Sequence, residues 1–187
     1  TPTWGEMNGW PAFKQNVNAD GITSAAIATV IVDVTGRFSV EWAGMPMVAG
    51  AGTDMLLSQL DSAGGWSFVW NGTTGLFTLS LYDNAGALAR SISTPAGSAV
   101  IGQSTHVVIE SRTGGTAGSA WVRGIPVTAT LAGAGVAANI SNATPIVTGA
   151  GVGVAMSFLA RASSETADHE RVTALYQQAR VLLGGDA

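Results

Sequence analysis

Two carboxylates, Glu41 and Glu110, are the first candidates for chemistry in this sequence. Glycoside hydrolysis needs a pair of carboxyl groups about 5–9.5 Å apart across a cleft, one to donate a proton and one to attack or to activate water. Each of these glutamates is isolated in its own strand-like segment. They could approach each other only if the two strands were adjacent. We therefore interpret both as solvated or paired residues on a strand face, and we expect no catalytic residue and no enzymatic activity.

The two histidines form no hydrolytic or metal-binding pattern. A hydrolytic triad needs a positioned serine, histidine and acid, and the G-x-S-x-G turn that often presents the serine is missing. His106 opens a predicted strand, where we expect a local hydrogen bond, and His169 lies in the first turn of a predicted helix, where we expect it to be solvated. Neither has a second ligand at zinc-site spacing. The chain has no cysteine, which removes disulfides and thiolate chemistry.

Calcium is the cofactor that the residue types leave open, because loop carboxylates, amides and backbone carbonyls are its usual ligands. The candidate ligands all fall in predicted turns: Asp54, Asp61, Asp83 and Asn84. Aspartate and asparagine in turns commonly accept hydrogen bonds from the backbone of the turn itself. We therefore expect these side chains to stabilise turns, and we predict no cofactor and no metal.

Tryptophan can supply the flat apolar surface that a sugar or protein partner needs. Trp42, Trp66 and Trp70 alternate with other residues in strand-like segments, which predicts that they are buried. Trp121 shares the alternation phase of Arg123, so we expect it either to be exposed and contact a partner or ligand, or to belong to the core. The candidate partner-contact residues are this tryptophan and the aromatic residues of the N-terminal segment: Trp4, Trp10, Phe13 and Trp121.

Charged residues make up only 11% of the 187 residues, well below the ~25% of an average soluble domain. A surface of small neutral side chains is weakly hydrated and suits a protein that is packed against neighbours; a genome that favours alanine and glycine is the alternative explanation. The net charge of −4 and the scattered basic residues argue against nucleic acid as a partner. No run of ~20 apolar residues indicates a membrane span. The first residues do not resemble a signal peptide, so we expect synthesis in a cytoplasm without export.

Short strand-like segments separated by turn signals predict an all-β sandwich or barrel. The segments are 26–34, 37–43, 55–60, 66–70, 76–82, 87–93, 106–112, 120–123, 145–148 and 154–160. Asn71-Gly72 predicts a hairpin turn. Residues 1–22 show no clean periodicity, and we interpret them as an N-terminal arm that precedes one domain over residues 23–187.

The hydrophobic period changes at the C-terminus. Val172, Leu175, Tyr176 and Ala179 recur at helical spacing. This pattern predicts one amphipathic helix over about 164–183, laid on the β-domain and capped by Ser163 or the serine that follows it.

Four segments resemble the laminin-G-like, concanavalin A-like jelly-roll domains. They are 38–42 (FSVEW), 105–109 (THVVI, without the tryptophan that precedes it in the family), 121–127 (WVRGIPV) and 158–163 (FLARAS) followed by Glu165, Leu175 and Tyr176. The resemblance implies two packed antiparallel sheets. Members of this family bind sugars, proteins or calcium, form virion and cell-surface modules, or carry glycosidase sites with an E-x-D-x-x-E strand, which is missing here.

We expect this chain to be a non-enzymatic virion structural protein, namely a phage capsid decoration or cement protein on the virion surface. Its partners would be capsid or other virion proteins and copies of itself, and many weak contacts on a lattice would supply avidity. The alternative is a lectin-like carbohydrate-binding domain, free-standing or on a tail or spike, with a glycan partner. A glycoside hydrolase would require Glu41 or Glu110 to act in catalysis.

Overall fold

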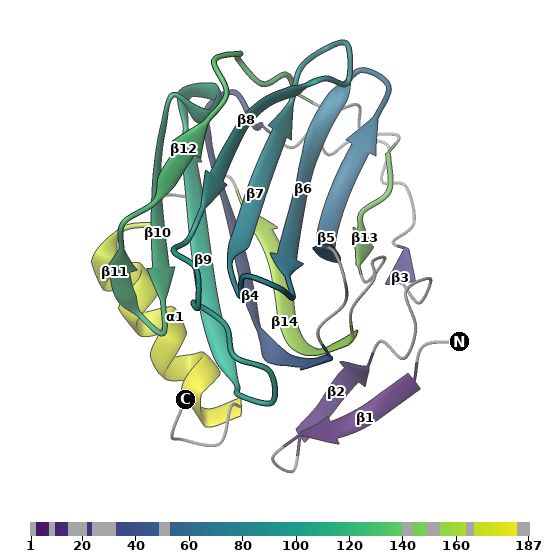
Figure 1. The fold of residues 1–187 in the computed structure, drawn as a ribbon, viewed down its shortest axis with the longest axis vertical. Helices are drawn as coiled ribbons and strands as arrows, with labels where there is room; N and C mark the ends of the chain where they lie inside the picture. Colours follow the sequence, from purple (N-terminus) through teal and green to yellow (C-terminus); the bar gives the residue numbers. More distant parts are fainter. Residues whose placement is uncertain are drawn as a thin grey trace.

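Two seven-stranded antiparallel sheets face each other in the computed structural model, and one helix lies outside them (Figure 1). The structure describes residues 3–7, 10–14, 22–23, 33–48, 53–139, 144–148, 154–163 and 167–182. This is the all-β jelly-roll sandwich with a C-terminal helix that the sequence predicts. The strand predicted at 26–34 lies almost wholly outside the described residues.

The first sheet, which we name sheet A, contains the first and the last strand of the described chain. Its order is β1 (Thr3–Met7), β2 (Trp10–Lys14), β14 (Val154–Ser163), β4 (Arg37–Val48), β9 (Thr105–Arg112), β10 (Ala117–Val122) and β11 (Ile125–Val127). A single 3₁₀ turn, η1 (Thr113–Gly115), joins β9 to β10. The predicted N-terminal arm is therefore not irregular throughout, because β1 and β2 form a hairpin and β2 pairs with β14.

The second sheet, sheet B, is largely a meander of consecutive strands. Its order is β12 (Thr130–Ala132), β8 (Leu88–Ser93), β7 (Phe77–Tyr82), β6 (Gly64–Asn71), β5 (Thr53–Asp61), β13 (Val147–Thr148) and β3 (Ile22–Thr23). The predicted Asn71-Gly72 turn joins β6 to β7, and Asn71 Oδ1 accepts hydrogen bonds from the N–H groups of Thr73 and Thr74 at 2.9 Å each. Short local connections thus build this sheet.

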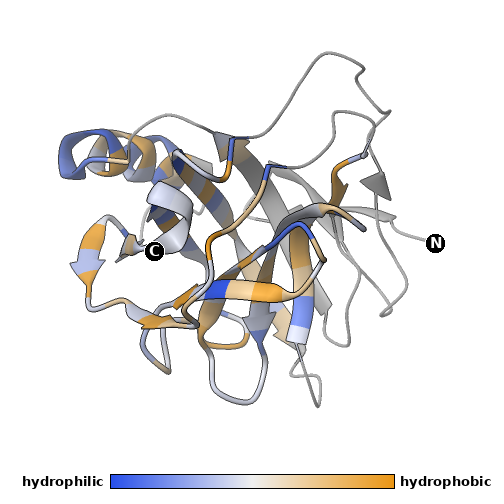
Figure 2. Ribbon diagram, turned by 90° about the horizontal axis from the view of Figure 1, so that it is seen from above, coloured by the Kyte–Doolittle hydropathy of each residue, from blue (hydrophilic) through white to orange (hydrophobic). Residues whose placement is uncertain are grey.

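The core between the sheets follows from strict alternation along the strands. Strands of both sheets carry hydrophobic and hydrophilic residues in turn (Figure 2). The largest fully buried side chains are aromatic: Phe38, Trp42, Trp66, Phe68, Trp70 and Phe77. Phe68 and Phe77 stack across β6 and β7 with ring centroids 5.9 Å apart. The predicted burial of Trp42, Trp66 and Trp70 is confirmed.

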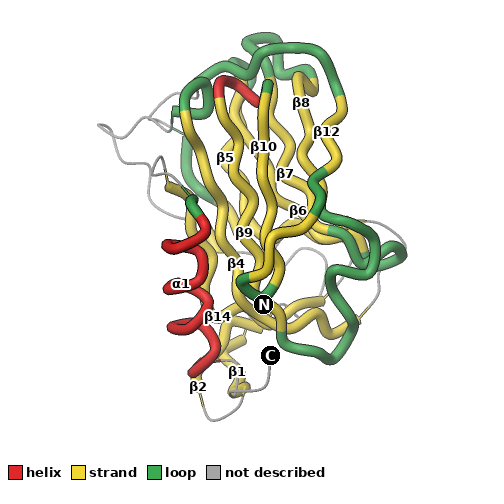
Figure 3. The backbone as a smooth tube through the Cα atoms, turned by 90° about the vertical axis from the view of Figure 1, so that its left-hand side faces the viewer, coloured by secondary structure: helices red, strands yellow, loops and turns green. Residues whose placement is uncertain are grey.

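The C-terminal helix α1 (His169–Leu182) packs outside sheet A, on the side away from sheet B (Figure 3). The predicted serine cap is wrong: Asp168 precedes the helix, and its Oδ1 accepts the N–H of Arg171 at 2.8 Å. Capping by aspartate satisfies one of the unpaired N–H groups of the first turn. Val172 and Ala179 on the inner side are buried. No helix of the described residues is long and apolar enough to cross a membrane.

Candidate functional site

A buried pair, Glu41 and His106, lies between α1 and the outer face of sheet A. Glu41 Oε1 is 2.8 Å from His106 Nε2, and the two side chains are 4% and 0% exposed. Strands β4 and β9 bring them together, since Ala43 pairs with His106 and Glu41 pairs with Val108. The ring of Tyr176 from α1 packs against His106 with centroids 5.8 Å apart. The hydrogen bond of His106 is therefore long-range rather than local.

Glu110 lies on the same face of β9 and anchors the start of α1. Its Oε2 accepts a hydrogen bond from Arg112 Nε at 2.7 Å, and its Oε1 accepts the backbone N–H of Ala167 at 3.1 Å. The Glu110 side chain is completely buried. Of the two predicted alternatives, solvated or paired, the structure shows the paired one; the alternation pattern does not reveal that a helix covers this face of the sheet.

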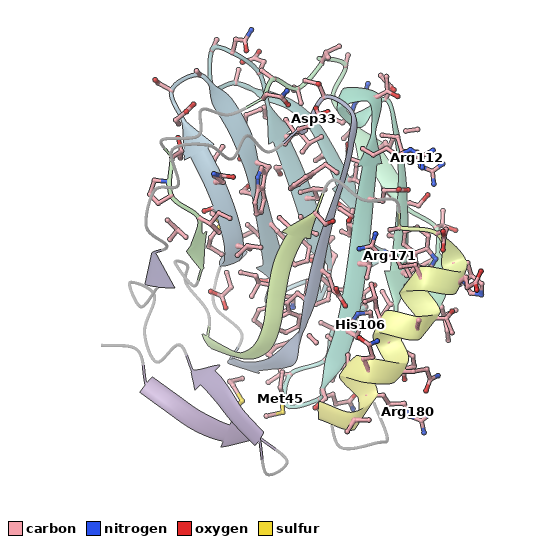
Figure 4. The ribbon with its side chains drawn as sticks, turned by 180° about the vertical axis from the view of Figure 1, so that it is seen from behind. Asp33, Met45, His106, Arg112, Arg171 and Arg180 are labelled. Carbon is pink, nitrogen blue, oxygen red and sulfur yellow. The ribbon has the colours of Figure 1, made fainter. Side chains whose placement is uncertain are left out.

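The polar cluster beneath α1 leaves little room for a substrate. Glu41 and Glu110 do lie on adjacent strands and on the same face, the arrangement that a catalytic pair would need. Both are covered, however, and His106 and Arg171 point into the layer between helix and sheet (Figure 4). A cavity of about 10 Å³ beside Glu41, Val108 and Arg171 is enough for about one water molecule. The geometry is that of a structural anchor for α1.

Trp121 lies in the same layer and is 6% exposed. It forms a second small hydrophobic cluster with Val108, Ala167 and Val172. Trp121 is therefore buried rather than exposed, which is the core alternative, since the helix covers the face on which alternation places it. The side chains of the other candidate contact residues, Trp4, Trp10 and Phe13, lie outside the described side chains, although their backbones belong to β1 and β2.

The predicted turn carboxylates are candidate calcium ligands, but two of them accept hydrogen bonds from the backbone of their own turns. Asp61 Oδ1 accepts the N–H of Ala63 at 2.7 Å, and Asp83 Oδ1 accepts those of Ala85 and Ala87 at 2.9 Å each. Asp54 is not in a turn: it lies within β5 and is 1% exposed. Among the described residues, no three acidic or histidine side chains converge as a metal site would require.

The outer face of sheet B carries a regular array of hydroxyl groups. Ser58, Ser67, Ser80 and Ser91 pair with one another in register across β5, β6, β7 and β8. A second row, offset by two residues, contains Thr78, Ser93 and Thr130. Tyr82 projects on the same face, and its hydroxyl lies 3.4 Å from Ser67 Oγ. We call these eight residues the hydroxyl face: Ser58, Ser67, Thr78, Ser80, Tyr82, Ser91, Ser93 and Thr130.

A separate open pocket of about 340 Å³ lies at one end of the sandwich. It is formed by the loop between β8 and β9 and by the β10–β11 hairpin. Its apolar wall consists of Pro95, Val100, Val122, Ile125 and Val127, and its polar groups are Ser98, Gln103 and Arg123. A pocket of this size, mostly apolar with a few polar groups, is typical of small-molecule sites. Residue spacing does not predict this pocket, because its lining comes from two separate segments, 95–103 and 122–127.

The fold and these surfaces define a β-sandwich domain with open surfaces on sheet B and at the loop end, rather than an enzyme-like cleft in the described residues. Solved structures with the same fold include the botulinum neurotoxin serotype G binding domain (TM-score 0.71, 14% identity, 95% of this chain and 45% of that chain). They also include the binding domain of Paraclostridial Mosquitocidal Protein 1 (TM-score 0.70, 12% identity, 98% and 48%). A third is the receptor binding domain of botulinum neurotoxin C/D mosaic serotype (TM-score 0.64, 12% identity, 89% and 42%).

The chain spans less than half the length of these structures. At such low identity the likeness shows the fold alone. No family model matches the sequence, and no curated protein matches it.

Proposed function

We propose that this chain is a non-catalytic, lectin-like domain that binds a carbohydrate through the hydroxyl face of sheet B. The observation that carries the proposal is the register of Ser58, Ser67, Ser80 and Ser91 across four neighbouring strands. Adjacent strands are about 4.8 Å apart, so the hydroxyls repeat at a regular interval. Each hydroxyl both donates and accepts hydrogen bonds, which matches the hydroxyl groups of a glycan. Ser80 and Ser91 are half-buried and would meet the glycan directly, whereas Ser58 and Ser67 are 9% and 3% exposed and extend the row below the surface.

Tyr82 adds an apolar ring to the same face. Its side chain is half-buried, and its hydroxyl lies 3.4 Å from Ser67 Oγ. An aromatic ring beside hydrogen-bonding groups is the combination that sugar recognition uses, because the ring contacts the C–H surface of the pyranose. The solved structures with this fold are named as binding or receptor binding domains, which supports recognition rather than catalysis.

The burial of the acidic residues also supports a non-catalytic role. Glu41 and Glu110 are at most 4% exposed, and their carboxylates accept hydrogen bonds from His106, Arg112 and the N–H of Ala167. A glycosidase needs both carboxyl groups free to face the scissile bond. Activity that disappears in Glu41→Gln or Glu110→Gln would contradict this part of the proposal.

Glycan-array binding of the purified chain tests the carbohydrate proposal. We expect saturable binding to a subset of glycans, with about five-fold weaker affinity in Ser80→Ala and in Ser91→Ala, since one hydrogen bond contributes about 1 kcal/mol. Ser62→Ala is the matched control, because Ser62 is an exposed serine in the β5–β6 turn and not on the hydroxyl face. Binding to no glycan, or equal losses in the control, would reject the proposal.

A second candidate is the virion decoration role that the composition suggests. Its specific support is the set of large apolar side chains that are at least 45% exposed: Leu88, Val100, Ile101, Ile125, Val136 and Val181. Exposed apolar groups that are gathered on a surface mark protein contacts. Of this set, Val100 and Ile125 lie together in the pocket at the loop end. Co-assembly with capsids that is lost on deleting residues 1–13, without glycan binding, would favour decoration over the lectin-like role.

A further inference from the structure

The pocket at the loop end has one charged group among its lining residues, the guanidinium of Arg123. Its Nη2 lies 3.5 Å from Gln103 Oε1 and 3.5 Å from the backbone oxygen of Ser104. These distances are at the outer limit of a hydrogen bond, so both contacts are weak. The five N–H groups of the guanidinium therefore have few good acceptors within the protein.

The remaining interactions of Arg123 leave its charge unneutralised. Its Nε is buried and has no hydrogen-bond partner. No carboxylate of the described residues forms an ion pair with it, in contrast to Arg112, which lies 2.7 Å from Glu110. A half-buried cation whose acceptors are uncharged and at the limit of hydrogen-bond distance is costly, and an anion that enters the pocket would reduce that cost.

The backbone at Arg123 is also unusual. Arg123 has φ of 52° and Gly124 has φ of 74°, and together they form the two-residue turn between β10 and β11. Turns with positive φ at both positions favour Asn-Gly, Asp-Gly or Gly-Gly, since other residues are strained there. Arginine in this place gives the turn no conformational advantage. Strained residues of this kind are concentrated at functional sites, where the side chain has a use.

The walls around Arg123 determine which chemical group can be attached to the anionic group of a ligand. Val100, Val122, Ile125 and Val127 present branched aliphatic side chains, and Ile125 is 65% exposed. Among the residues that the structure describes, no aromatic side chain lines the pocket, so stacking against a sugar ring has no partner here. An aliphatic group would bury apolar surface against these walls, whereas a polyol would lose hydration and find few polar groups, Ser98 and Gln103 besides Arg123.

We propose that this pocket binds a small organic acid, with its carboxylate on the Arg123 guanidinium and a short branched aliphatic group against Val100, Val122 and Ile125. Guanidinium and carboxylate match in charge and in bidentate geometry. The site is distinct from the hydroxyl face and does not rest on the carbohydrate proposal. Its volume of about 340 Å³ limits the ligand to a small molecule.

Titration of the whole chain with 4-methylpentanoate, followed by methyl NMR and calorimetry, tests the proposal. We expect saturable shifts of the Val100 and Ile125 methyl resonances and none at Val136, which is exposed in the 133–139 segment. The neutral 4-methylpentanamide and the polar anion glucuronate are matched probes. Each is expected to bind at least ten-fold more weakly. Equal binding of the amide would overturn the role of the charge, and equal binding of glucuronate would overturn the aliphatic requirement.

Arg123→Asn is the decisive variant, because asparagine suits the turn while it removes the guanidinium. We expect 4-methylpentanoate to bind at least ten-fold more weakly to it. Arg37→Gln is the control. Arg37 pairs with Arg112 near the opposite end of β9, so this variant removes the same charge far from the pocket and should leave binding unchanged. If Arg123→Asn binds 4-methylpentanoate as tightly as the unaltered chain, the proposed site is rejected. If that variant does not fold, methyl shifts in the unaltered chain that fail to centre on Val100 and Ile125 would overturn it equally.

Discussion

His106 Nε2 lies 2.8 Å from Glu41 Oε1 beneath α1, although the two residues are 65 positions apart in the sequence. The pair is buried on β9 and β4, on the face of sheet A that an alternation pattern assigns to solvent. Because His106 Nδ1 has no hydrogen-bond partner among the described residues, the polar contact of this ring is the one with the Glu41 carboxylate. The hydrogen bond joins two strands of sheet A, and the Tyr176 ring that packs against His106 connects this pair to α1.

Loss of the carboxylate from this pair should destabilise the fold. We expect Glu41→Leu to lower the free energy of unfolding by about 1–3 kcal/mol, because it leaves the buried imidazole without its acceptor. Glu41→Gln keeps an oxygen at the same position and should cost less. Urea denaturation of the two variants measures the difference. A Leu variant as stable as the Gln variant would show that the pair contributes nothing to the docking of α1.

The small cluster under α1 can be tested separately from the main core. Trp121 is 6% exposed and packs with Val108, Ala167 and Val172. Trp121→Ala should cost about 3–5 kcal/mol, the range for removing a large buried aromatic side chain. Hydrogen exchange should accelerate first in α1. The matched control Val136→Ala, at a 63% exposed position, should change stability by less than about 0.5 kcal/mol.

Position 124 requires glycine for two reasons: its backbone has a positive φ, and the Tyr176 ring leaves no room for a Cβ. The φ of Gly124 is +74°, and a Cβ there would lie 2.8 Å from Tyr176 Cδ1 and 3.1 Å from Cγ. Gly102 has φ of +75° and nothing within 4 Å of its Cβ position, so it isolates the backbone effect. We expect Gly102→Ala to cost about 1 kcal/mol. Gly124→Ala should cost about 1–3 kcal/mol more, because the backbone and the ring must separate. Thermal unfolding midpoints compare the two, and equal shifts would mean that Tyr176 moves freely.

Asp33 makes the stability of the folded state depend on pH in the acidic range. The Thr35 hydroxyl donates to Asp33 Oδ1 at 2.7 Å and the Gly36 N–H at 2.9 Å, and these hydrogen bonds lower the pKa of the carboxyl below its ordinary value. The unfolded chain thus binds a proton at higher pH than the folded chain. The stabilisation is complete above the unfolded pKa and is lost as the pH falls through the folded pKa.

Asp33→Asn should therefore flatten the acid limb of the stability curve. We expect a small effect, because the carboxylate is exposed and solvent screens it. Urea denaturation between about pH 2 and pH 6 measures it, the range that brackets the ordinary aspartate pKa. Parallel curves for the variant and the unaltered chain would show that these hydrogen bonds are equally formed in the unfolded state.

Periodicity was sufficient for the parts of the fold in which one face of an element meets the main core. The alternation of Phe38, Val40 and Trp42 correctly predicted a buried strand face, and the helical spacing of Val172 and Ala179 correctly predicted which side of α1 packs inward. Both signals are local: each residue's environment depends on its position within one element.

Periodicity failed where a second layer covers the outer face of a strand. Glu41, Glu110 and Trp121 occupy positions whose phase predicts solvent, and α1 then buries them. The row of serines was equally hidden, because it exists only in the register between strands and not within any one of them. The Arg123 pocket needs two loops to meet in space. Each of these features depends on long-range pairing, which residue spacing in the sequence does not encode.

The place of β14 in sheet A determines when the domain can be completed during synthesis. This strand is next to the last element of the described chain, yet it lies between β2 and β4 and pairs with both. The β5–β8 meander can form from neighbouring hairpins while the ribosome is still adding residues. Sheet A, in contrast, stays open between its N-terminal hairpin and β4 until Ser163 has emerged. Such late closure of non-local strands is slow, and the exposed edges of β2 and β4 would then be the segments that a nascent chain most needs to shield from other chains.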